Sequence, residues 1–322
     1  MRIDQLLVQR GLASTRSQAQ RLIADGVEWR QGEAWRQVVK NGDDVPAEAE
    51  LKLLDDSEAR YVSRGGLKLE AALKHVGLSV DGLQCLDVGQ STGGFTDCLL
   101  QHGAAMVVGV DVGSAQLHPQ LRGDPRVLCV EGLNARSLDA ADLIAAYEDS
   151  IGAGGQFDLE DDVDDEDDED DEDDALDQTG SQPTKPRHDD SPDTLEGDLE
   201  DEDAAQADMV SSDGAFVPAF DVIVADLSFI SQTLVLPAVV PLLKAGGTLL
   251  TLVKPQFELQ PGQVGKGGIV KDAAMYALVE QRLRDSCAEL GLTVTHWFDS
   301  PIAGGDGNRE FFICARQAGA AD

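Results

Sequence analysis

Four charged residues and one glycine-rich segment are the parts of this sequence whose types and spacing could do chemistry. Two of the four end apolar runs that are typical of buried strands, one opens a predicted helix, and one follows a glycine-rich turn. A lysine that is partly removed from water and close to another cation is less stable as an ammonium ion, so it can take a proton from a weakly acidic hydroxyl. Each residue alone is more often a surface ion-pair partner, but two lysines and two acids at one rim would be unusual by chance. The four are Lys68, Asp226, Lys254 and Glu310.

The glycine-rich segment, residues 89–94, follows a strand-like run and opens a helix. Glycines at such a turn let the backbone approach a ligand, and the helix N-terminus adds hydrogen-bond donors. The pattern is not GxGxxG, which disfavours a pyrophosphate site. Asp111 ends the next strand about 20 residues on, where an acid typically accepts hydrogen bonds from ribose hydroxyls. Turn and acid together indicate a nucleoside-bearing cofactor, although the turn alone could be structural.

The surrounding elements indicate an α/β domain. Strand-like runs alternate with helical stretches, which predicts a mostly parallel sheet whose ligands bind outside the carboxyl ends of the strands. The last two strands are joined by residues 300–308 alone, so we expect them to pair antiparallel. The predicted strands are 83–88, 106–111, 127–131, 220–226, 248–254, 293–299 and 309–315, and the clearest helices are 231–243 and 273–290.

Residues 1–57 form a separate small unit in this interpretation. Ile3, Leu6 and Leu7 have helical spacing, and a possible capping box at 15–18 announces a second helix that Gly26 ends. A short strand is expected at 27–30, and further short strands within 38–54 around the turn 41–43.

The first 24 residues are the most basic stretch of the chain, with four arginines against one acid, Asp4. A solvated helical face is one interpretation. A surface that contacts phosphates is the other, because the arginine fork suits phosphate oxygens. The four arginines are Arg2, Arg10, Arg16 and Arg21.

The charge of the chain is concentrated in one segment. Between Gln156 and Asp213 there are 27 acidic residues against two basic ones, a net −25 of the total −35, which leaves −10 for the rest. Such a run cannot bury enough apolar area to offset its ordering entropy, so residues 152–216 are predicted to be a disordered insertion. The insertion interrupts one α/β domain, whose parts are 60–151 and 217–316. The total charge therefore does not exclude an anionic partner.

The remaining composition narrows the protein class. Five scattered cysteines without a CxxC favour buried reduced thiols and no metal site. We find no apolar stretch of about 18 residues and no signal-like start, so no membrane association is expected and a cytoplasmic protein is the default.

In combination, the motifs are specific enough to indicate a family. The chain resembles TlyA/hemolysin A-type proteins, which join an S4-like RNA-binding domain of α+β type to a Rossmann-like, FtsJ-like S-adenosylmethionine-dependent methyltransferase domain. The resemblance covers nearly all residues except the acidic insertion. It rests on Arg2-Ile3-Asp4-x-x-Leu7, Ser14-x-Arg16-Ser17-x-Ala19, Ser63-Arg64-Gly65-Gly66-x-Lys68-Leu69, Asp87-Val88-Gly89-x-Ser91-Thr92-Gly93-Gly94-Phe95-Thr96-Asp97, Asp226-x-Ser228-Phe229, Val253-Lys254-Pro255-Gln256-Phe257 and Gly307-Asn308-x-Glu310.

The resemblance implies 2′-O-methylation of ribose in ribosomal RNA, at cytidine, with ribosomal RNA or ribosomal subunits as partners and no metal. It implies a catalytic tetrad of Lys68, Asp226, Lys254 and Glu310. It places S-adenosylmethionine at Asp87, Gly89, Ser91, Thr92, Gly93, Gly94, Phe95, Asp111, Asn134 and Asp226, and RNA at Arg2, Arg10, Arg16, Arg21 and Arg64. Gln90 departs from the small residue usual at its position.

Our mechanistic hypothesis makes Lys254 the acceptor of the 2′-hydroxyl proton. Lys68 and Asp226 tune and hold it, and Glu310 fixes the lysines or the ribose. Two alternatives are a haemolysin-like membrane-active protein and an S4 RNA-binding protein with an inactive methyltransferase domain. An inactive domain would be expected to have lost part of the tetrad, whereas all four residues are present.

Overall fold

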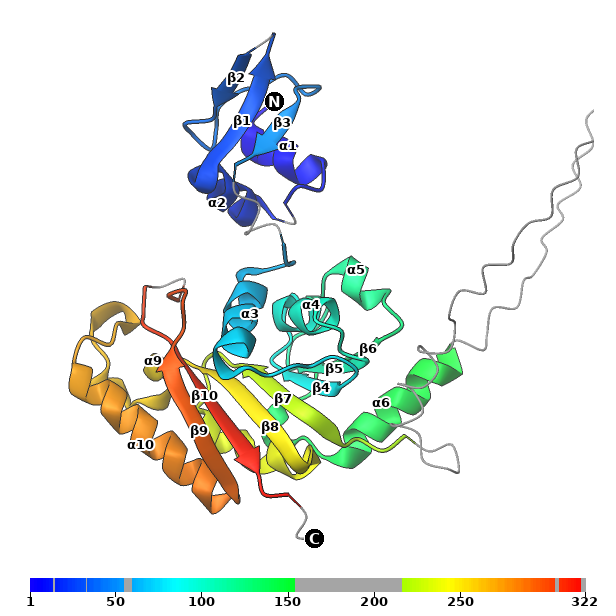
Figure 1. Ribbon diagram of the computed structural model, residues 1–322, viewed down its shortest axis with the longest axis vertical. Helices are drawn as coiled ribbons and strands as arrows, with labels where there is room; N and C mark the ends of the chain where they lie inside the picture. Colours follow the sequence, from blue (N-terminus) through cyan, green and yellow to red (C-terminus); the bar gives the residue numbers. More distant parts are fainter. Residues whose placement is uncertain (14, 33, 55–59, 154–215, 305–306, 320–322) are drawn as a thin grey trace, which may run out of the picture.

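The computed structural model describes residues 1–13, 15–32, 34–54, 60–153, 216–304 and 307–319, which form a small N-terminal unit and a larger α/β unit (Figure 1). Ser14 and nearly all of the acidic insertion lie outside the described residues, so the predicted disorder stays a prediction.

The N-terminal unit packs two helices against a three-stranded antiparallel sheet of order β2-β1-β3. Its core contains the predicted apolar stripe, including Ile3, Leu7 and Leu22. Thr15 caps the second helix by accepting a hydrogen bond from the Gln18 N–H at 3.2 Å. The elements are α1 (Ile3–Gln9), α2 (Arg16–Gly26), β1 (Val27–Gln31), β2 (Ala34–Gln37) and β3 (Leu51–Leu53).

The expectation of several strands within 38–54 was wrong in part. Only β3 lies within residues 38–54. β2 ends before this range, and residues 38–50 form turns and irregular structure. The carboxylate of Asp43 accepts hydrogen bonds from the N–H groups of Val39 and Lys40, both at 3.0 Å. Side-chain bonds of this kind compete with strand ladders, so they hold the segment in a turn.

The α/β unit contains a seven-stranded sheet of order β6-β5-β4-β7-β8-β10-β9. The first five strands in this order are parallel, and β10 is antiparallel to both β8 and β9, as the short 300–308 connection predicts. The predicted bounds of three strands, 106–111, 127–131 and 220–226, are the bounds observed. The strands are β4 (Gln84–Val88), β5 (Met106–Asp111), β6 (Val127–Glu131), β7 (Phe220–Asp226), β8 (Leu243–Val253), β9 (Leu292–Asp299) and β10 (Phe311–Gln317).

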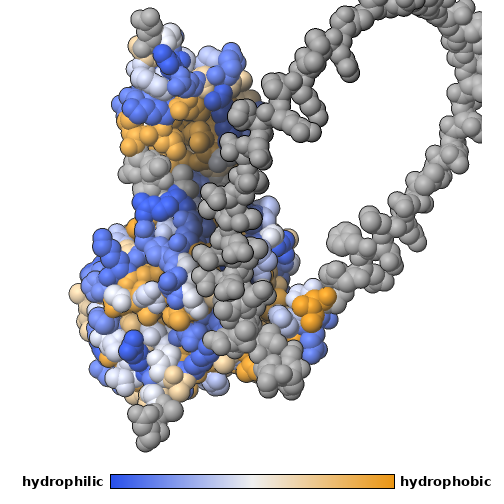
Figure 2. Space-filling view, turned by 45° about the vertical axis from the view of Figure 1, so that its right-hand side comes forward, coloured by the Kyte–Doolittle hydropathy of each residue, from blue (hydrophilic) through white to orange (hydrophobic). Residues whose placement is uncertain are grey.

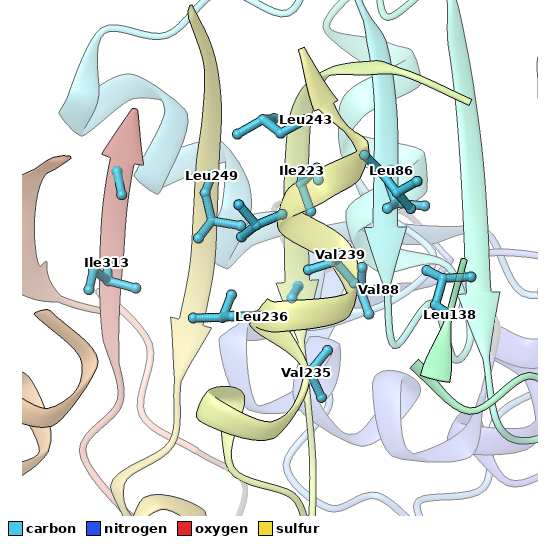
Figure 3. Close-up of a cluster of buried hydrophobic side chains, with 14 of the residues drawn as sticks. Leu86, Val88, Leu138, Ile223, Val235, Leu236, Val239, Leu243, Leu249 and Ile313 are labelled. Carbon is cyan, nitrogen blue, oxygen red and sulfur yellow. The ribbon is translucent and has the colours of Figure 1, made fainter. Parts of the chain in front are cut away.

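Two apolar cores cover the two faces of this sheet. One face packs on α3 (Arg64–Val76), α4 (Gly94–Gln101) and α5 (Pro119–Arg122) through Leu69, Leu99 and Leu121. The opposite face packs on α6 (Ala140–Ala153), α8 (Leu236–Val239) and α10 (Ala273–Glu289); Figure 3 shows Leu236 and Val239 of α8 beside Ile223 of β7. The central strands are therefore apolar on both faces, which is why they read as continuous apolar runs.

The predicted helix at 231–243 is instead broken into three short pieces. They are η3 (Gln232–Leu234), α8 and η4 (Val240–Leu242), and β8 begins at Leu243, earlier than expected. Pro237 and Pro241 each lie in the first turn of a piece. Proline lacks the N–H that a continuing helix needs, so each proline starts a new helical turn.

Strand order reverses beside β4, because the chain runs outward to β5 and β6 and then returns to β7 on the other side. Ligands of open α/β sheets bind outside the carboxyl ends of the strands at such a point. Here those ends are Gly89 after β4 and Asp226 at the end of β7.

Candidate active site

The glycine-rich turn brings the starts of two helices together. Gly94 begins α4, and a Cβ atom on it would lie 2.1 Å from the Oγ of Ser63, the residue before α3. The same Cβ atom would lie 3.0 Å from the Gly66 backbone nitrogen, so a larger residue at Gly94 would crowd the first turn of α3. The turn therefore fixes the start of α3, and with it Lys68 in the second turn of that helix.

A cavity of about 890 Å³ opens beside this turn at the reversal point. Its size lies within the range of roughly 300–1,000 Å³ that is typical of cofactor pockets. The residues that line it come from the ends of β4, β5 and β7 and from the segment after β6, and they include Gly89, Ser91, Asp111, Asn134, Arg136, Asp226 and Phe229.

Asp111 lies at this cavity, at the end of β5 as predicted. Its two carboxylate oxygens accept hydrogen bonds from the N–H groups of Ser91 at 2.8 Å and Gly113 at 2.7 Å. Each carboxylate oxygen has a second lone pair, so Asp111 can still accept from ribose hydroxyls. Asn134 accepts from the Arg136 N–H at 3.1 Å and caps the turn that borders the cavity. These residues fit a nucleoside-bearing ligand.

Asp87 lies below the turn and lines neither this cavity nor the smaller one beside it. Its side chain is fully buried and accepts from the Thr96 hydroxyl at 2.7 Å, and burial raises the pKa of its carboxyl to about 7. Gln90 donates to the same hydroxyl at 2.9 Å. The side chain of Gln90 fits because Gly109 has no Cβ, which would come within 2.0 Å of it.

A smaller cavity of about 230 Å³ adjoins the larger one and shares Gly89, Ser91, Asp226 and Ser228 with it. Lys254 lines only the smaller cavity. The remaining lining residues lie at the starts of α3 and α4 and are Ser63, Gly65, Gln90, Thr92, Gly94 and Phe95. The two cavities share four lining residues, so ligands occupying them would lie next to each other.

The four charged residues form two ion pairs. The Nζ of Lys254 lies 2.5 Å from Asp226 Oδ1, and the Nζ of Lys68 lies 2.5 Å from Glu310 Oε2. The side chains of the second pair are 10% and 3% exposed, so this pair is almost closed to water. We expected one lysine beside another cation, but each lysine contacts a carboxylate.

Strand register brings the two pairs to the same edge of the sheet. Phe311 of β10 is opposite Val253 of β8. Glu310 and Lys254 each lie one residue beyond this pair, so they are neighbours at the end of the two strands. Lys254 also donates to the Ser228 hydroxyl at 3.0 Å. Asp226 and Lys254 line the smaller cavity, and the Lys68–Glu310 pair lies next to Lys254 through this register.

Phe229 lines the larger cavity, although the sequence analysis quoted it only within a motif and assigned it no role. Its side chain is 90% exposed, its φ is +64°, and its ring centroid lies 5.0 Å from that of Phe257. A bulky residue rarely adopts this backbone conformation, and such strain is common at ligand sites. The signal in the sequence was an aromatic three residues after the strand-end acid Asp226.

The arginines predicted to contact RNA have partners within the protein. Arg2 and Arg16 both bind the buried carboxylate of Asp4 at 2.9 Å, and these guanidinium groups hold the pKa of that carboxyl well below its usual range. Arg10 donates to the carbonyls of Ala47 and Ala49. Arg2 and Arg16 nevertheless keep about half of their side-chain surface exposed. Arg21 lies half-buried on α2, and Arg64 donates to the carbonyl of Ala303.

The part of the chain that the structure describes contains no metal-ligand group, no disulfide and no membrane-spanning helix. It holds no group of three or more His, Cys, Asp or Glu residues that could bind a metal ion, and its five cysteines are free thiols. None of its helices is long and apolar enough to cross a membrane. Figure 2 shows polar residues interspersed with small apolar areas on one face of the larger unit.

The sheet order, the strand-end acid and the paired cavities define a Rossmann-like enzyme that binds a nucleoside-bearing ligand. Comparison with known proteins makes the assignment specific. Residues 61–317 match the FtsJ-like methyltransferase model and residues 1–26 match the S4 domain model. The chain belongs to the FtsJ-like methyltransferase family and carries an S4 domain at its N-terminal end.

Individual relatives extend over both units. The chain is 34% identical over 315 residues to the 16S/23S rRNA (cytidine-2'-O)-methyltransferase TlyA of Mycobacterium tuberculosis, covering 98% of this chain and 89% of the relative. It is 31% identical over 316 residues to Hemolysin A of Brachyspira hyodysenteriae, covering 97% and 98%. A solved structure of a hemolysin-named protein from Streptococcus thermophilus is 31% identical, with a TM-score of 0.59 and coverage of 99% and 88%.

Proposed function

We propose that this methyltransferase transfers a methyl group from S-adenosylmethionine to a ribose 2′-hydroxyl of ribosomal RNA, at cytidine. The observation that carries the proposal is the adjoining pair of cavities, one suited to a nucleoside and the other lined by the Lys254–Asp226 ion pair. The names of the TlyA relatives support the choice of ribosomal RNA and cytidine.

The larger cavity is the proposed cofactor site. Asp111 and Asn134 would hold the nucleoside part, and the turn from Gly89 to Gly94 would hold the amino-acid part. Bound S-adenosylmethionine supplies an electrophilic methyl group. The protein's contribution is to align this group with the acceptor oxygen, which can account for a large part of the rate enhancement.

The smaller cavity is the proposed acceptor site. Lys254 takes the 2′-hydroxyl proton, and Asp226 and Ser228 hold its amine in place. Only a neutral amine can accept this proton, which then leaves to water. The buried Lys68–Glu310 pair fixes the neighbouring strand and helix.

Phe229 is the proposed support for the acceptor base. An aromatic ring that projects into solvent at the edge of a catalytic cavity can stack on an unpaired nucleobase, as single-stranded RNA recognition commonly requires. The S4 domain, with the half-exposed Arg2 and Arg16, would contact RNA at a distance from the catalytic edge. Its action on ribosomal RNA would place the protein in the cytoplasm.

The test combines binding with product analysis. Calorimetry should detect S-adenosylmethionine binding, and incubation with undermethylated ribosomal subunits followed by nucleoside mass spectrometry should yield 2′-O-methylcytidine. Methylation of a base instead of a ribose would refute the proposed acceptor. Cofactor binding without any methylated nucleoside would favour the inactive-domain alternative, and loss of both would leave the haemolysin-like alternative.

A further inference from the structure

We propose that residues 259–271 form a phosphate-binding loop that contacts the RNA backbone next to the acceptor nucleotide. Lys266 and Lys271 are its two cations. The inference rests on the proposed function and extends it, because it assigns a second RNA-contacting surface outside the S4 domain. The loop sequence LQPGQVGKGGIVK contains two lysines and no acid, in a chain with 60 acidic and 25 basic residues.

The loop is attached at both ends to the catalytic residues. It begins after α9 (Pro255–Glu258), which directly follows Lys254. Its far end is held by Asn308, which is 2% exposed: the side-chain oxygen accepts from the Val270 N–H at 2.9 Å, and the side-chain nitrogen donates to the Gly268 carbonyl at 2.9 Å. Asn308 lies two residues before Glu310. The loop therefore has a fixed position relative to both ion pairs of the tetrad.

A backbone hydrogen bond closes the tip of the loop, and residues 265–268 at this tip are exposed to solvent. The Gly265 N–H donates to the Ile269 carbonyl at 3.0 Å, and Gly267 and Gly268 have φ values of +79° and +81°. A Cβ atom on either of these two glycines would meet nothing within 4 Å, so a ligand can approach the backbone here. In Figure 1 the loop between α9 and α10 lies at the same end of the sheet as the start of α3.

The two lysines are available for an anion. Both are exposed, and neither has an ion-pair partner within 4.0 Å among the described residues. A lysine ammonium binds phosphate as a compact point charge. An RNA strand with its ribose in the smaller cavity necessarily carries phosphates on both sides of that ribose. The loop is connected to Lys254 through α9 and is held by Asn308 two residues before Glu310, so we assign the phosphates next to the acceptor to its two lysines.

Salt-dependent binding of fluorescein-labelled single-stranded RNA to the full chain tests this assignment. Each lost phosphate contact on single-stranded nucleic acid makes the slope of log K against log salt shallower by about 0.7, so the affinity that a variant loses relative to the wild type is roughly fivefold greater at 0.1 M than at 1 M salt. Lys266→Ala or Lys271→Ala should each show this change. In the double variant, the affinity lost relative to the wild type should be about 25-fold greater at 0.1 M than at 1 M salt. Lys266→Arg should bind as the wild type does, because it keeps the charge.

Lys74→Ala is the matched control, since Lys74 is an exposed lysine near the far end of α3. It should leave both slope and affinity unchanged, and all variants should bind S-adenosylmethionine as the wild type does. Wild-type slopes in the Lys266 and Lys271 variants would overturn the loop assignment while leaving the proposed function standing. Absence of RNA binding by the wild-type protein would overturn both.

Discussion

Replacing Lys254 with alanine is the perturbation that the site geometry makes most informative. Lys254 is the tetrad cation that lines the smaller cavity. Among the described residues that line the larger cavity, Asp226 and Ser228 are the ones that contact its amine. A positioned general base contributes typically about 10²- to 10⁴-fold to the rate, or roughly 2.7–5.5 kcal/mol of barrier. We therefore expect methyl transfer to fall by that factor while the cofactor Kd changes less than about threefold.

Loss of folding could imitate loss of catalysis, so a control variant with a comparable ion pair is needed. Removing Lys254 leaves the Asp226 carboxylate without its partner; because that side chain is 24% exposed, we expect a cost of roughly 1–2 kcal/mol, below the 3–5 kcal/mol of a fully buried pair. Lys244 makes an equivalent β8-to-β7 pair with Asp221 at 3.0 Å near the start of β8. Lys244→Ala should transfer methyl groups at the wild-type rate.

The assay is a single-turnover measurement with RNA and saturating cofactor. A wild-type rate in Lys254→Ala, with cofactor binding intact, would remove this lysine from the chemistry.

Three further predictions concern carboxylates. Asp111→Asn should raise the cofactor Kd by roughly 10- to 150-fold, the equivalent of about 1.5–3 kcal/mol for a hydrogen bond to a charged group, and an unchanged Kd by calorimetry would place the cofactor elsewhere. Asp87→Asn should become more stabilising as pH rises. The pKa of the Asp87 carboxyl in the folded protein, about 7, lies above its unfolded value, so the wild-type protein loses roughly 4 kcal/mol of folding stability as pH passes from about 4 through 7. A melting-temperature difference between variant and wild type that stays constant from pH 5 to pH 8 would contradict this. Asp4→Asn should destabilise the N-terminal unit by roughly 1–3 kcal/mol at neutral pH, because Arg2 and Arg16 lose their charged partner; their stabilisation is present above the unfolded pKa of Asp4 and is lost as pH falls. Hydrogen exchange in α1 measures it, and wild-type protection would show that the ion pairs do not stabilise the helix.

The sequence predicted the parts of the fold whose signals are local. The strands at 106–111, 127–131 and 220–226 are apolar runs with clear ends, and their bounds are confirmed. The helix at 231–243 was wrong because its apolar spacing looks helical, whereas Pro237 and Pro241 interrupt it. A periodicity argument counts apolar positions and gives no weight to the N–H groups that proline lacks.

The pairings within the site depend on contacts that sequence reasoning cannot see. Lys68 and Glu310 are 242 residues apart in the chain, and the helix and strand that bring them together are positioned by the fold. For the same reason the sequence indicated four charged residues at one rim, with Asp226 holding Lys254, but did not specify that Glu310 contacts Lys68. Gln90 is a further example, since its fit depends on Gly109 in the next strand.

The central claim is that the adjoining cavities transfer a methyl group to a ribose oxygen. The most direct test supplies radiolabelled S-adenosylmethionine and two matched RNA substrates, identical except that one has 2′-deoxycytidine at the acceptor position mapped by mass spectrometry. We predict label incorporation into the ribose substrate and none into the deoxy substrate. Equal incorporation into both would contradict 2′-O transfer and would require an acceptor atom on the base.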